Sequence, residues 1–383
     1  MAPIYLDNAA TTEIHPDVLE EMRPYLKDQY FNPSTLYSGG REAARAVQKA
    51  REQVAKFINA DPMQIIFTSG GTEANNTVLR SPISFKSRKK ILISASEHDS
   101  IMNTYGVLRR IGEASPVEPI RITSDGVIDM DDFKEKLTDD TDLVSVMYVN
   151  NETGAINPVL DIGKMCMEHG AFFHTDCVQA AGNEKIDVNE IQCDFISLSS
   201  HKIHGPKGVG ALYVKDKSEL SPLIIGGNGH EMGMRGGTEN VAGIVGFGKA
   251  CELAGKDSVL YAELKKEFLD SLYYSLSQKG FFDIVTINGN PEKSTAKIIN
   301  LRIKGVDGET LVLMLSATGI YISAGAACRS HETTPSYVLT AMGLSPEEAM
   351  NSVRIAFSRF NSETEVIVAA RHIADCVEKL LKN

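Results

Sequence analysis

The chain has 383 residues, of which 43% are hydrophobic, and 39 basic against 50 acidic side chains give it a formal net charge of −11. This length and composition exclude a disordered chain and a small disulfide-stapled scaffold, because a chain of this size can bury a large core. The acidic excess also disfavours a surface that serves mainly to neutralise nucleic acid phosphates.

The first two thirds of the chain predict alternating helices and strands. Apolar and small residues at helical spacing predict a helix over 41–59, and another is expected over 162–169. Short apolar runs predict buried strands at 65–68, 91–94, 143–149, 171–174, 195–198 and 210–214. Such alternation is typical of an α/β fold, in which a mostly parallel sheet is covered by helices on both faces and forms three layers.

The pattern changes after about residue 229. A long amphipathic helix over 259–277, strands at 296–303 and 353–357, and a terminal helix over 363–381 predict a second, smaller α+β domain. We expect the boundary near residue 255.

The cysteines and the chain start bear on the compartment. The six cysteines are irregularly spaced, and residues 1–7 show neither the basic nor the apolar region of a secretory signal. We therefore expect a reduced, cytoplasmic chain. The longest uncharged stretch, Leu311–Cys328, is interrupted by Ser, Thr and Gly and does not predict a membrane span.

A run of small residues, Phe67–Asn76, leads from a predicted strand into a predicted helix. Its glycines allow close backbone approach, and the helix N-terminus favours a phosphate group. A plain helix start capped by Ser or Thr is the alternative. No Lys-Ser/Thr pair follows the glycines, so the run is not a Walker loop.

Two charged residues follow later strands. Asp176 ends an apolar run, where α/β folds place ligands, and it could pair with a protonated ring nitrogen. A helix N-cap is the alternative for Asp176. Lys202 follows the strand at 195–198, and a lysine held at such a strand end can form a Schiff base. A surface lysine in a turn is the alternative.

One cysteine has an unusual setting. Cys328 lies within Ile322–His331, where small residues precede it and Arg329 and His331 follow it. Nearby cations favour the reactive thiolate. A buried structural cysteine is the alternative, which the charged flank disfavours.

A metal site is a further alternative for the cysteines. Cys166-x-x-His169 and His174-x-x-Cys177 superficially match paired ligand spacing. His174 and Cys177 would point to opposite faces of one strand, because side chains alternate along a strand. We therefore expect no metal, and we interpret Cys177 as a packing residue.

The combination of these features points to one cofactor. A phosphate cradle, a carboxylate for a ring nitrogen and a Schiff-base lysine are the parts that a pyridoxal phosphate site needs. With the cysteine added, the chain resembles the cysteine desulfurases of the NifS/IscS type, which are fold-type I pyridoxal phosphate enzymes. The matching motifs run nearly end to end: Tyr5–Thr12, Asn32–Ser34, Thr68–Asn76, Glu97–Ser100, Asn150–Gly154, His201–Lys202, Gly205–Gly208, Arg235–Asn240, Pro335–Leu339 and Ser352–Arg354.

The resemblance implies which residues bind pyridoxal 5'-phosphate. Lys202 is expected to hold the cofactor covalently and to shuttle protons, and Asp176 to pair with its ring nitrogen. Gln179 is expected to bind the ring hydroxyl, and His98 to stack on the ring and assist proton transfer. The residues expected to hold the phosphate are Gly71, Thr72, Ser199 and His201.

The resemblance also implies the reaction. Asn151 and Arg354 are expected to bind the carboxylate of L-cysteine, for which the planar guanidinium is well suited. Cys328 is expected to take the sulfur as a persulfide, and the rest of the substrate leaves as L-alanine. Thr238 is expected to reach the phosphate in a partner subunit, which implies a homodimer with shared sites.

The resemblance further implies a large cofactor-binding domain over residues 14–255, and a small domain over 1–13 and 256–383 that carries the cysteine loop. A sulfur-acceptor protein, such as an iron–sulfur scaffold, is the implied partner. Thio-cofactor or nucleoside biosynthesis are other uses of the sulfur, and we expect no membrane and no direct nucleic acid contact.

Some positions depart from the family pattern. The usual Ser-Ser-Gly-Ser-Ala-Cys is here Ser323–Cys328 with Arg329 after it, which bears on acceptor choice more than on the chemistry. Tyr37 stands where His is common, and Met232 where Arg is common. A selenocysteine lyase, a class V aminotransferase and a non-catalytic scaffold of a sulfur-transfer complex remain alternatives.

Overall fold

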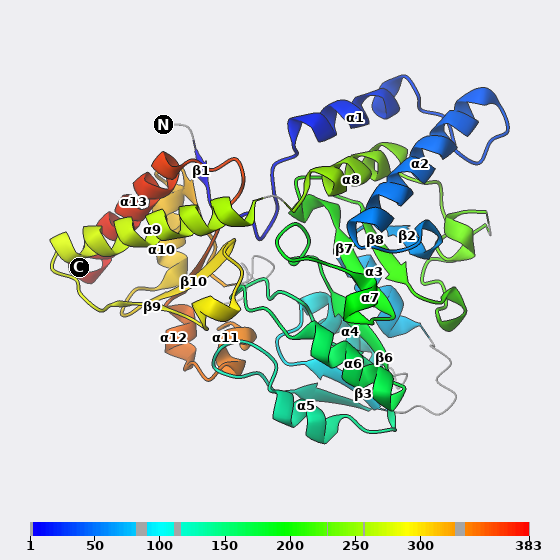
Figure 1. Ribbon diagram of the computed structural model, residues 1–383. Helices are drawn as coiled ribbons and strands as arrows, with labels where there is room; N and C mark the ends of the chain where they lie inside the picture. Colours follow the sequence, from blue (N-terminus) through cyan, green and yellow to red (C-terminus); the bar gives the residue numbers. More distant parts are fainter. Residues whose placement is uncertain are drawn as a thin grey trace.

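A seven-stranded sheet forms the centre of the larger part of the protein (Figure 1). The structure is a computed structural model that describes residues 3–81, 90–110, 116–227, 229–255, 257–325 and 334–382. The strands are, in spatial order, β2 (Ile65–Thr68), β8 (Gly210–Val214), β7 (Phe195–Ser199), β6 (Phe172–Asp176), β5 (Thr141–Ser145), β3 (Lys90–Ser94) and β4 (Val117–Ile120).

Helices cover both faces of this sheet, because side chains alternate between the faces and both are apolar. In β2, Ile65 and Phe67 pack into one core cluster, and Ile66 packs into another on the opposite face. The first cluster takes side chains from α1 (Pro16–Lys27), α2 (Ser38–Phe57), α5 (Met130–Lys136), α6 (Val159–His169), α7 (Val188–Ile191) and α8 (Val241–Leu253). The second takes them from α3 (Gly71–Arg80) and α4 (Asp99–Arg110). The predicted three-layer α/β architecture is confirmed.

The strand directions decide where a site can form. Of the described strands in this sheet, β8 alone runs antiparallel to its neighbours, and the others all run one way. The carboxyl ends of β2, β3, β5, β6 and β7 therefore meet at one edge of the sheet. The loops that follow them converge there, as they do in open α/β sheets that bind ligands.

A second, smaller α+β part contains an antiparallel sheet of β12 (Ser352–Ala356), β10 (Ile298–Ile303) and β9 (Val285–Ile287). The short strands β1 (Ile4–Tyr5) and β11 (Ile320–Tyr321) pair in parallel beside it. Its core joins these strands to α9 (Ser258–Gln278), α10 (Gly308–Ser316) and α13 (Glu363–Lys382). The helices α11 (Tyr337–Ala341) and α12 (Pro346–Met350) form a separate small cluster with Ile122.

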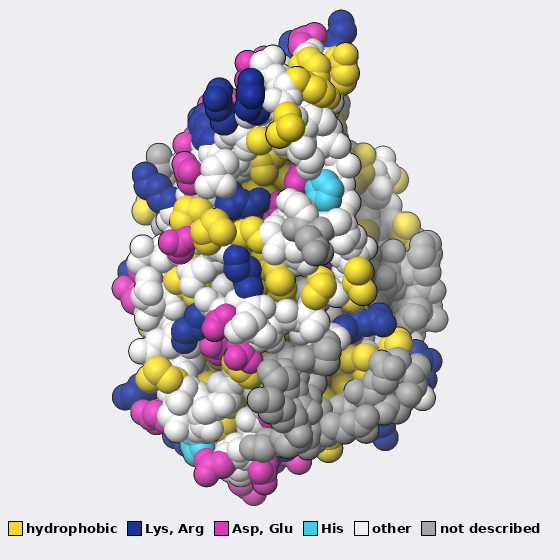
Figure 2. Space-filling view, turned by 90° about the vertical axis from the view of Figure 1, so that its right-hand side faces the viewer, with side chains coloured by type: hydrophobic (Ala, Val, Ile, Leu, Met, Phe, Trp, Pro, Cys, Tyr) yellow, Lys and Arg dark blue, Asp and Glu magenta, His cyan; other side chains and the backbone are white. Residues whose placement is uncertain are grey.

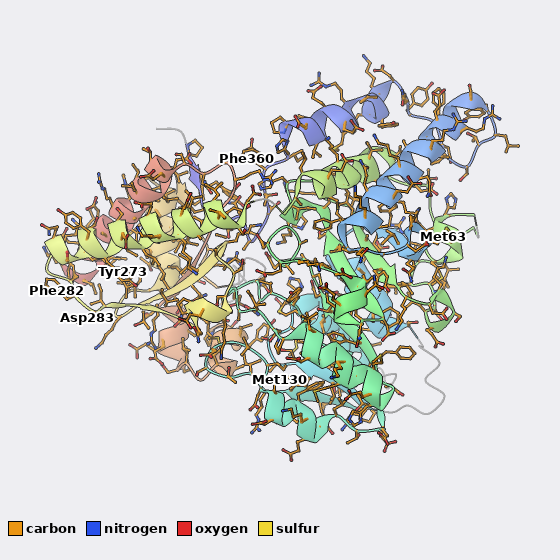
Figure 3. The ribbon with its side chains drawn as sticks, in the orientation of Figure 1. Met63, Met130, Tyr273, Phe282, Asp283 and Phe360 are labelled. Carbon is orange, nitrogen blue, oxygen red and sulfur yellow. The ribbon has the colours of Figure 1, made fainter. Side chains whose placement is uncertain are left out.

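An aromatic contact lies where the two parts meet. The ring of Phe360, labelled in Figure 3, packs edge-on against His204, with centroids 4.9 Å apart, and lies 5.6 Å from the ring of His15. Phe360 follows β12, whereas both histidines belong to segments that pack against the larger sheet. The contact therefore helps to hold the second sheet beside the edge where the loops converge.

Most predicted elements are confirmed to within a few residues, and β2 and β8 match their predicted ranges. The strand predicted over 143–149 is wrong at its end, because β5 stops at Ser145. The N–H of Met147 donates to a carboxylate oxygen of Glu97 (2.6 Å) and not to a neighbouring strand, since β3 has already ended at Ser94.

Within the described ranges, no helix is long and apolar enough to cross a membrane.

A buried ion pair fastens the chain segment after β8 to the edge of the large sheet. Arg51 of α2 makes two hydrogen bonds to the carboxylate of Glu231, of 2.7 and 2.9 Å. Glu231 also accepts the N–H of Phe67 (2.7 Å), and Arg51 donates to the carbonyl of Ile65 (2.6 Å). Glu231 itself has a positive φ of 43°, so these four bonds hold a backbone conformation that its side chain disfavours.

We expect Glu231→Ala to lower the free energy of unfolding by about 3–5 kcal/mol, because it leaves the Arg51 cation buried and unpaired. Asp270→Ala is the matched control: it breaks the exposed pair with Lys266 and is expected to cost less than about 1 kcal/mol. Urea unfolding of both variants measures the difference. Equal losses of unfolding free energy in the two variants would contradict the prediction that the buried pair stabilises the fold more than the exposed pair does.

Candidate active site

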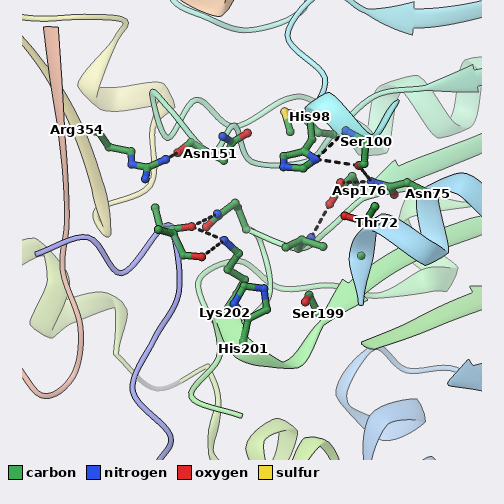
Figure 4. Close-up of a pocket in the computed structure, with 16 residues that line it drawn as sticks. Thr72, Asn75, His98, Ser100, Asn151, Asp176, Ser199, His201, Lys202 and Arg354 are labelled. Carbon is green, nitrogen blue, oxygen red and sulfur yellow. Dashed lines mark hydrogen bonds between the residues drawn. The ribbon is translucent and has the colours of Figure 1, made fainter. Parts of the chain in front are cut away.

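A cavity of about 220 Å³ lies at the edge of the large sheet where the loops converge, facing β12 of the second sheet (Figure 4). The residues that line it are Ala9, Ala10, Gly71, Thr72, Asn75, His98, Ser100, Met147, Asn151, Asp176, Val178, Gln179, Ser199, His201, Lys202 and Arg354. Five parallel strands of the large sheet, β2, β3, β5, β6 and β7, thus each contribute side chains at or just after their carboxyl ends, as the parallel topology requires.

This cavity brings together most of the residues predicted from the sequence, although their roles stay predictions. Those that line it are Gly71, Thr72, His98, Asn151, Asp176, Gln179, Ser199, His201, Lys202 and Arg354. Thr238 is exposed and does not line the cavity. Cys328 lies outside the described residues.

One end of the cavity suits an anion. Gly71 begins α3, and a Cβ on it would lie only 2.6 Å from Val178, so only glycine lets the backbone pass this close to the cavity wall. The N–H groups of the first turn of α3 are therefore available to a phosphate, beside Thr72 and Ser199. Gly71, Thr72 and Ser199 also line a neighbouring hollow of about 290 Å³, to which Lys207 contributes a positive charge.

His201 contributes a neutral ring to this end. Burial, with the positive charges of Lys202, Lys207 and Lys297 acting in the same direction, lowers its pKa to about 4. Its Nδ1 lies 3.1 Å from the hydroxyl of Thr11, which orients the ring. His201 thus offers a hydrogen bond, while the three lysines supply the positive field that an anion requires.

Asp176 is buried and held on both oxygens. One oxygen accepts the side-chain N–H of Asn75 (2.8 Å), and the other accepts the backbone N–H of Val178 (2.9 Å). The bond from the Val178 N–H, two residues further on, is of the kind that a helix N-cap makes, and an N-cap was the alternative prediction for Asp176. The carboxylate nevertheless also lines the cavity, where it can pair with a protonated ring nitrogen.

A second carboxyl group lies behind Asp176. Glu97 is fully buried, and burial, together with the nearby charge of Asp176, raises its pKa well above the usual value. Burial therefore favours the neutral, protonated form of Glu97 beside the carboxylate of Asp176. The sequence did not predict this role of Glu97, although Glu97 precedes His98 in the Glu97–Ser100 motif.

Lys202 points into the cavity and is not a surface lysine. Its ammonium donates to the backbone carbonyls of Ala9 and Ala10, the latter at 2.7 Å. The side chain of Gln179 donates to the Ala9 carbonyl as well (2.8 Å), while its own Oε1 is buried with no partner in the described part of the chain. The N-terminal segment thus positions both residues.

Arg354 enters the cavity from β12 and is 1% exposed. Its guanidinium donates to the carboxylate of Asp7 (2.7 Å) and to the carbonyl of Asn151 (2.8 Å). Its Nε is buried without a hydrogen-bond partner among the residues described. Such a cation, with a donor left to satisfy, can bind a carboxylate.

Lys297 holds the backbone of Lys202 through a hydrogen bond. It is buried, and its ammonium donates to the backbone carbonyl of Lys202 (3.1 Å). Burial lowers the pKa of Lys297 to about 8; the carboxylate of Asp257 opposes this shift and the guanidinium of Arg359 adds to it.

The other described cysteines are packing residues in this structure. Cys166, Cys177, Cys193, Cys251 and Cys376 are buried, and burial raises the pKa of each thiol. A group of three or more His, Cys, Asp or Glu side chains placed to hold a metal ion is not found in the described ranges.

The cavity fits the cofactor that the resemblance implies. It exceeds the engineered cavity of about 150 Å³ that binds benzene, so it can hold a substituted ring. The amine of Lys202 suits an aldehyde, and the carboxylate of Asp176 suits a protonated ring nitrogen. The anion cradle at Gly71 suits a phosphate, and the unsatisfied Oε1 of Gln179 suits a ring hydroxyl.

The sequence matches known families over almost its whole length. The Aminotransferase class-V family model matches residues 4–368. The chain is 42% identical to the cysteine desulfurase IscS of Rickettsia massiliae, with 99% of this chain and 92% of the relative aligned. It is 40% identical to a cysteine desulfurase of Nostoc sp., with 99% and 94% aligned.

Solved structures agree with the fold. A NifS-like protein superposes with a TM-score of 0.88 at 33% identity, covering 99% of both chains. A structure described as SspA in complex with cysteine gives a TM-score of 0.82 at 34% identity, covering 94% of this chain and all of that one.

The buried Lys297 predicts a pH-dependent stability. Because its pKa is about 8 in the folded chain and about 10.4 when unfolded, the unfolded state binds more protons between these values, and stability rises with pH there. Lys297→Met is therefore expected to gain stability over wild type at pH 7.5, and this gain should shrink by up to about 3 kcal/mol by pH 10.

Thermal unfolding at pH 7.5, 8.5 and 9.5 measures the gap between Lys297→Met and wild type. Lys266→Met, at an exposed lysine, is the control whose gap should stay constant. A constant gap for Lys297→Met as well would contradict the prediction.

Proposed function

The chain belongs to the class V aminotransferase family, and we propose that it is a pyridoxal phosphate-dependent cysteine desulfurase, which converts L-cysteine to L-alanine and an enzyme-bound persulfide. One observation carries the proposal. Lys202, Asp176 and the anion cradle at Gly71 line a single cavity, with Arg354 on its opposite side. This arrangement accepts both the cofactor and an amino acid.

In this proposal, each cofactor group has a protein partner. The amine of Lys202 would bind the aldehyde carbon, and the carboxylate of Asp176 would keep a proton on the ring nitrogen. Gln179 would bind the ring hydroxyl. Gly71, Thr72, Ser199 and His201 would hold the phosphate. When bound, pyridoxal phosphate supplies an electron sink that stabilises negative charge at the substrate Cα.

The amino acid is oriented by its carboxylate. Arg354 and Asn151 bind that group, and Asp7 holds the guanidinium in place through the 2.7 Å ion pair. Lys202 and His98 line the same cavity as these two residues. With the cofactor and substrate bound, the Lys202 amine would take the Cα proton, and His98 would assist the transfer.

Sulfur transfer requires a nucleophile, and we assign it to Cys328. Its thiolate attacks the substrate sulfur, so that an S–S bond forms and the C–S bond breaks. The electron pair of the C–S bond remains with the carbon, which is protonated and leaves in L-alanine. The sulfur is oxidised to the sulfane level, and the substrate carbon is reduced.

The described residues that flank Cys328 support this assignment. Ser323 and Arg354 exchange two backbone hydrogen bonds, of 2.7 and 3.2 Å. On the other flank, the hydroxyl of Ser336 donates to Glu152 (2.5 Å), and that of Tyr337 donates to the carbonyl of Glu97. Both flanks are thus anchored beside residues that line or adjoin the cavity.

The proposal includes the division of the chain and its assembly. Residues 14–255 form the cofactor-binding domain, and residues 1–13 with 256–383 form the small domain. The protein is a homodimer in which Thr238 serves the site of the partner subunit. The exposure of Thr238 and its position away from the cavity of its own chain support this assignment.

The proposal also covers location and partners. The protein acts in the cytoplasm and passes its persulfide sulfur to an acceptor protein, such as an iron–sulfur scaffold or a factor for thio-cofactor or nucleoside synthesis. On the face shown in Figure 2, basic and acidic side chains are interspersed, and the net charge is −11. This surface favours a protein acceptor over direct nucleic acid contact.

The central test measures sulfide and alanine released from L-cysteine. We expect Lys202→Ala to lose both products and the visible absorbance of the bound cofactor. Cys328→Ala should keep the absorbance, because it does not hold the cofactor, but its sulfide release should fall to background. Cys376→Ala is the control that should retain activity, because Cys376 is buried in α13 and does not line the cavity.

Full sulfide release by Cys328→Ala would refute the mechanism. Faster turnover of selenocysteine than of cysteine would point to a selenocysteine lyase, and amino transfer to a keto acid by Cys328→Ala would point to an aminotransferase. Failure to take up pyridoxal phosphate would point to a non-catalytic scaffold.

The shared site is tested with mixed dimers. Thr238→Asp places a carboxylate against the phosphate, and Lys202→Ala removes the amine, so each variant alone should be inactive. A mixed dimer regains one intact site if Lys202 of one subunit works with Thr238 of the other. We expect up to about half of the mixed dimers' sites to be active, and no recovery on mixing would contradict the assignment.

A further inference from the structure

A continuous chain of hydrogen bonds joins Asp176 to His98 inside the cavity (Figure 4). The side-chain amide of Asn75 donates both to Asp176 Oδ2 and to Ser100 Oγ, each at 2.8 Å. Ser100 Oγ in turn lies 2.8 Å from Nδ1 of His98. Asn75 is 1% exposed and Ser100 is 8% exposed, so neither bond is open to exchange with bulk water.

The donors in this chain can point only one way. An amide nitrogen donates and never accepts, so Asn75 uses both of its N–H groups on Asp176 and Ser100. Ser100 Oγ accepts from Asn75, which directs its own hydrogen toward Nδ1 of His98. The backbone N–H of Ser100 also points at this nitrogen, at 3.1 Å.

His98 Nδ1 is therefore an acceptor, which places the ring hydrogen of the neutral imidazole on Nε2. Protonation at Nδ1 would face two donors and would require Ser100 to reverse its hydroxyl.

We propose that Asn75 and Ser100 are positioning residues, which orient His98 and hold it as the Nε2–H tautomer, so that it enters the reaction as a proton donor and Lys202 acts as the base. This inference rests on the proposed function for its catalytic meaning. The arrangement of the four side chains is a property of the folded chain by itself.

The same network couples Asp176, the expected partner of the ring nitrogen, to His98, which is expected to stack on the ring. Asn75 can serve Ser100 only while its amide plane faces Asp176, and Asp176 depends on the same amide for one of its two hydrogen bonds. Loss of Asn75 should therefore disturb both the carboxylate and His98, whereas loss of the Ser100 hydroxyl should disturb His98 alone.

Other ionisable groups surround His98. Glu97 and Asp99 flank it in the chain, Asp176 lies at the far end of the network, and Lys202 and Arg354 line the same cavity. The substitutions proposed as tests leave all of these groups in place.

The test observes the His98 ring directly, in holoenzyme labelled with ¹⁵N-histidine and without substrate. Long-range ¹H–¹⁵N spectra distinguish the tautomers, and the signal missing from His98→Gln assigns the residue. We expect Nε2–H in wild type. In Ser100→Ala one donor to the neutral ring is lost, so His98 should take up its second proton about half to one pH unit higher.

Thr104→Val is the matched control. It removes a hydroxyl from the next turn of α4 that donates to Asn76 (2.8 Å) and not to His98, so the His98 signal should not move. Asn75→Ala should shift both the His98 signal and the visible absorbance of the cofactor. Turnover of L-cysteine by Ser100→Ala should fall about two- to tenfold in kcat with little change in KM.

An Nδ1–H tautomer in wild type would overturn the inference, as would a His98 titration that is the same in Ser100→Ala and wild type. An equal shift in Thr104→Val would also overturn it, because the effect would then belong to α4 as a whole. Failure of the proposed function is seen separately, since the spectra need no substrate.

Discussion

The parallel alignment of the strands is the constraint on which the site depends. Because six strands of the large sheet run one way, the loops after β2, β3, β5, β6 and β7 emerge at one edge, and each delivers side chains to the same cavity. No single loop builds the site. The second sheet closes it from the opposite side by inserting Arg354, and the N-terminal segment brings in the carbonyls that hold Lys202.

Buried charge in this protein is balanced locally. Arg354 is paired with Asp7, and Arg51 with Glu231, each through short hydrogen bonds. Where no counter-charge touches a buried group, burial shifts its pKa toward the neutral form, as the raised pKa of Glu97 and the lowered pKa of His201 indicate. The effect at the cavity is a distinct anionic group at Asp176 and a cationic region around Lys202, which are the two poles that the proposed cofactor needs.

The hydrogen bonds from Asp176 through Asn75 and Ser100 to His98 fix which atom donates and which accepts at each step. An amide with both hydrogens committed cannot turn, so the serine hydroxyl and the imidazole must follow it. A histidine whose inner nitrogen accepts hydrogen bonds presents its proton to the cavity. The division of labour between a donor histidine and a basic lysine would then follow from hydrogen-bond geometry, without any large difference in electrostatic environment.

The amino-acid sequence by itself determined the α/β class and most of the elements, because apolar periodicity is a local property of a chain. The resemblance of its motifs to a known family implied ten of the residues that line the cavity. Even where the predicted ranges were correct, as for β2 and β8, the sequence did not show which elements pack into the same core. The tertiary structure alone decided that Asn75 and Ser100 connect Asp176 to His98, that Lys297 donates to the carbonyl of Lys202, and that burial raises the pKa of Glu97. Those features depend on burial and on contacts between residues far apart in the chain, such as Asn75 and Asp176, which are 101 positions apart, and both arise only when the chain packs.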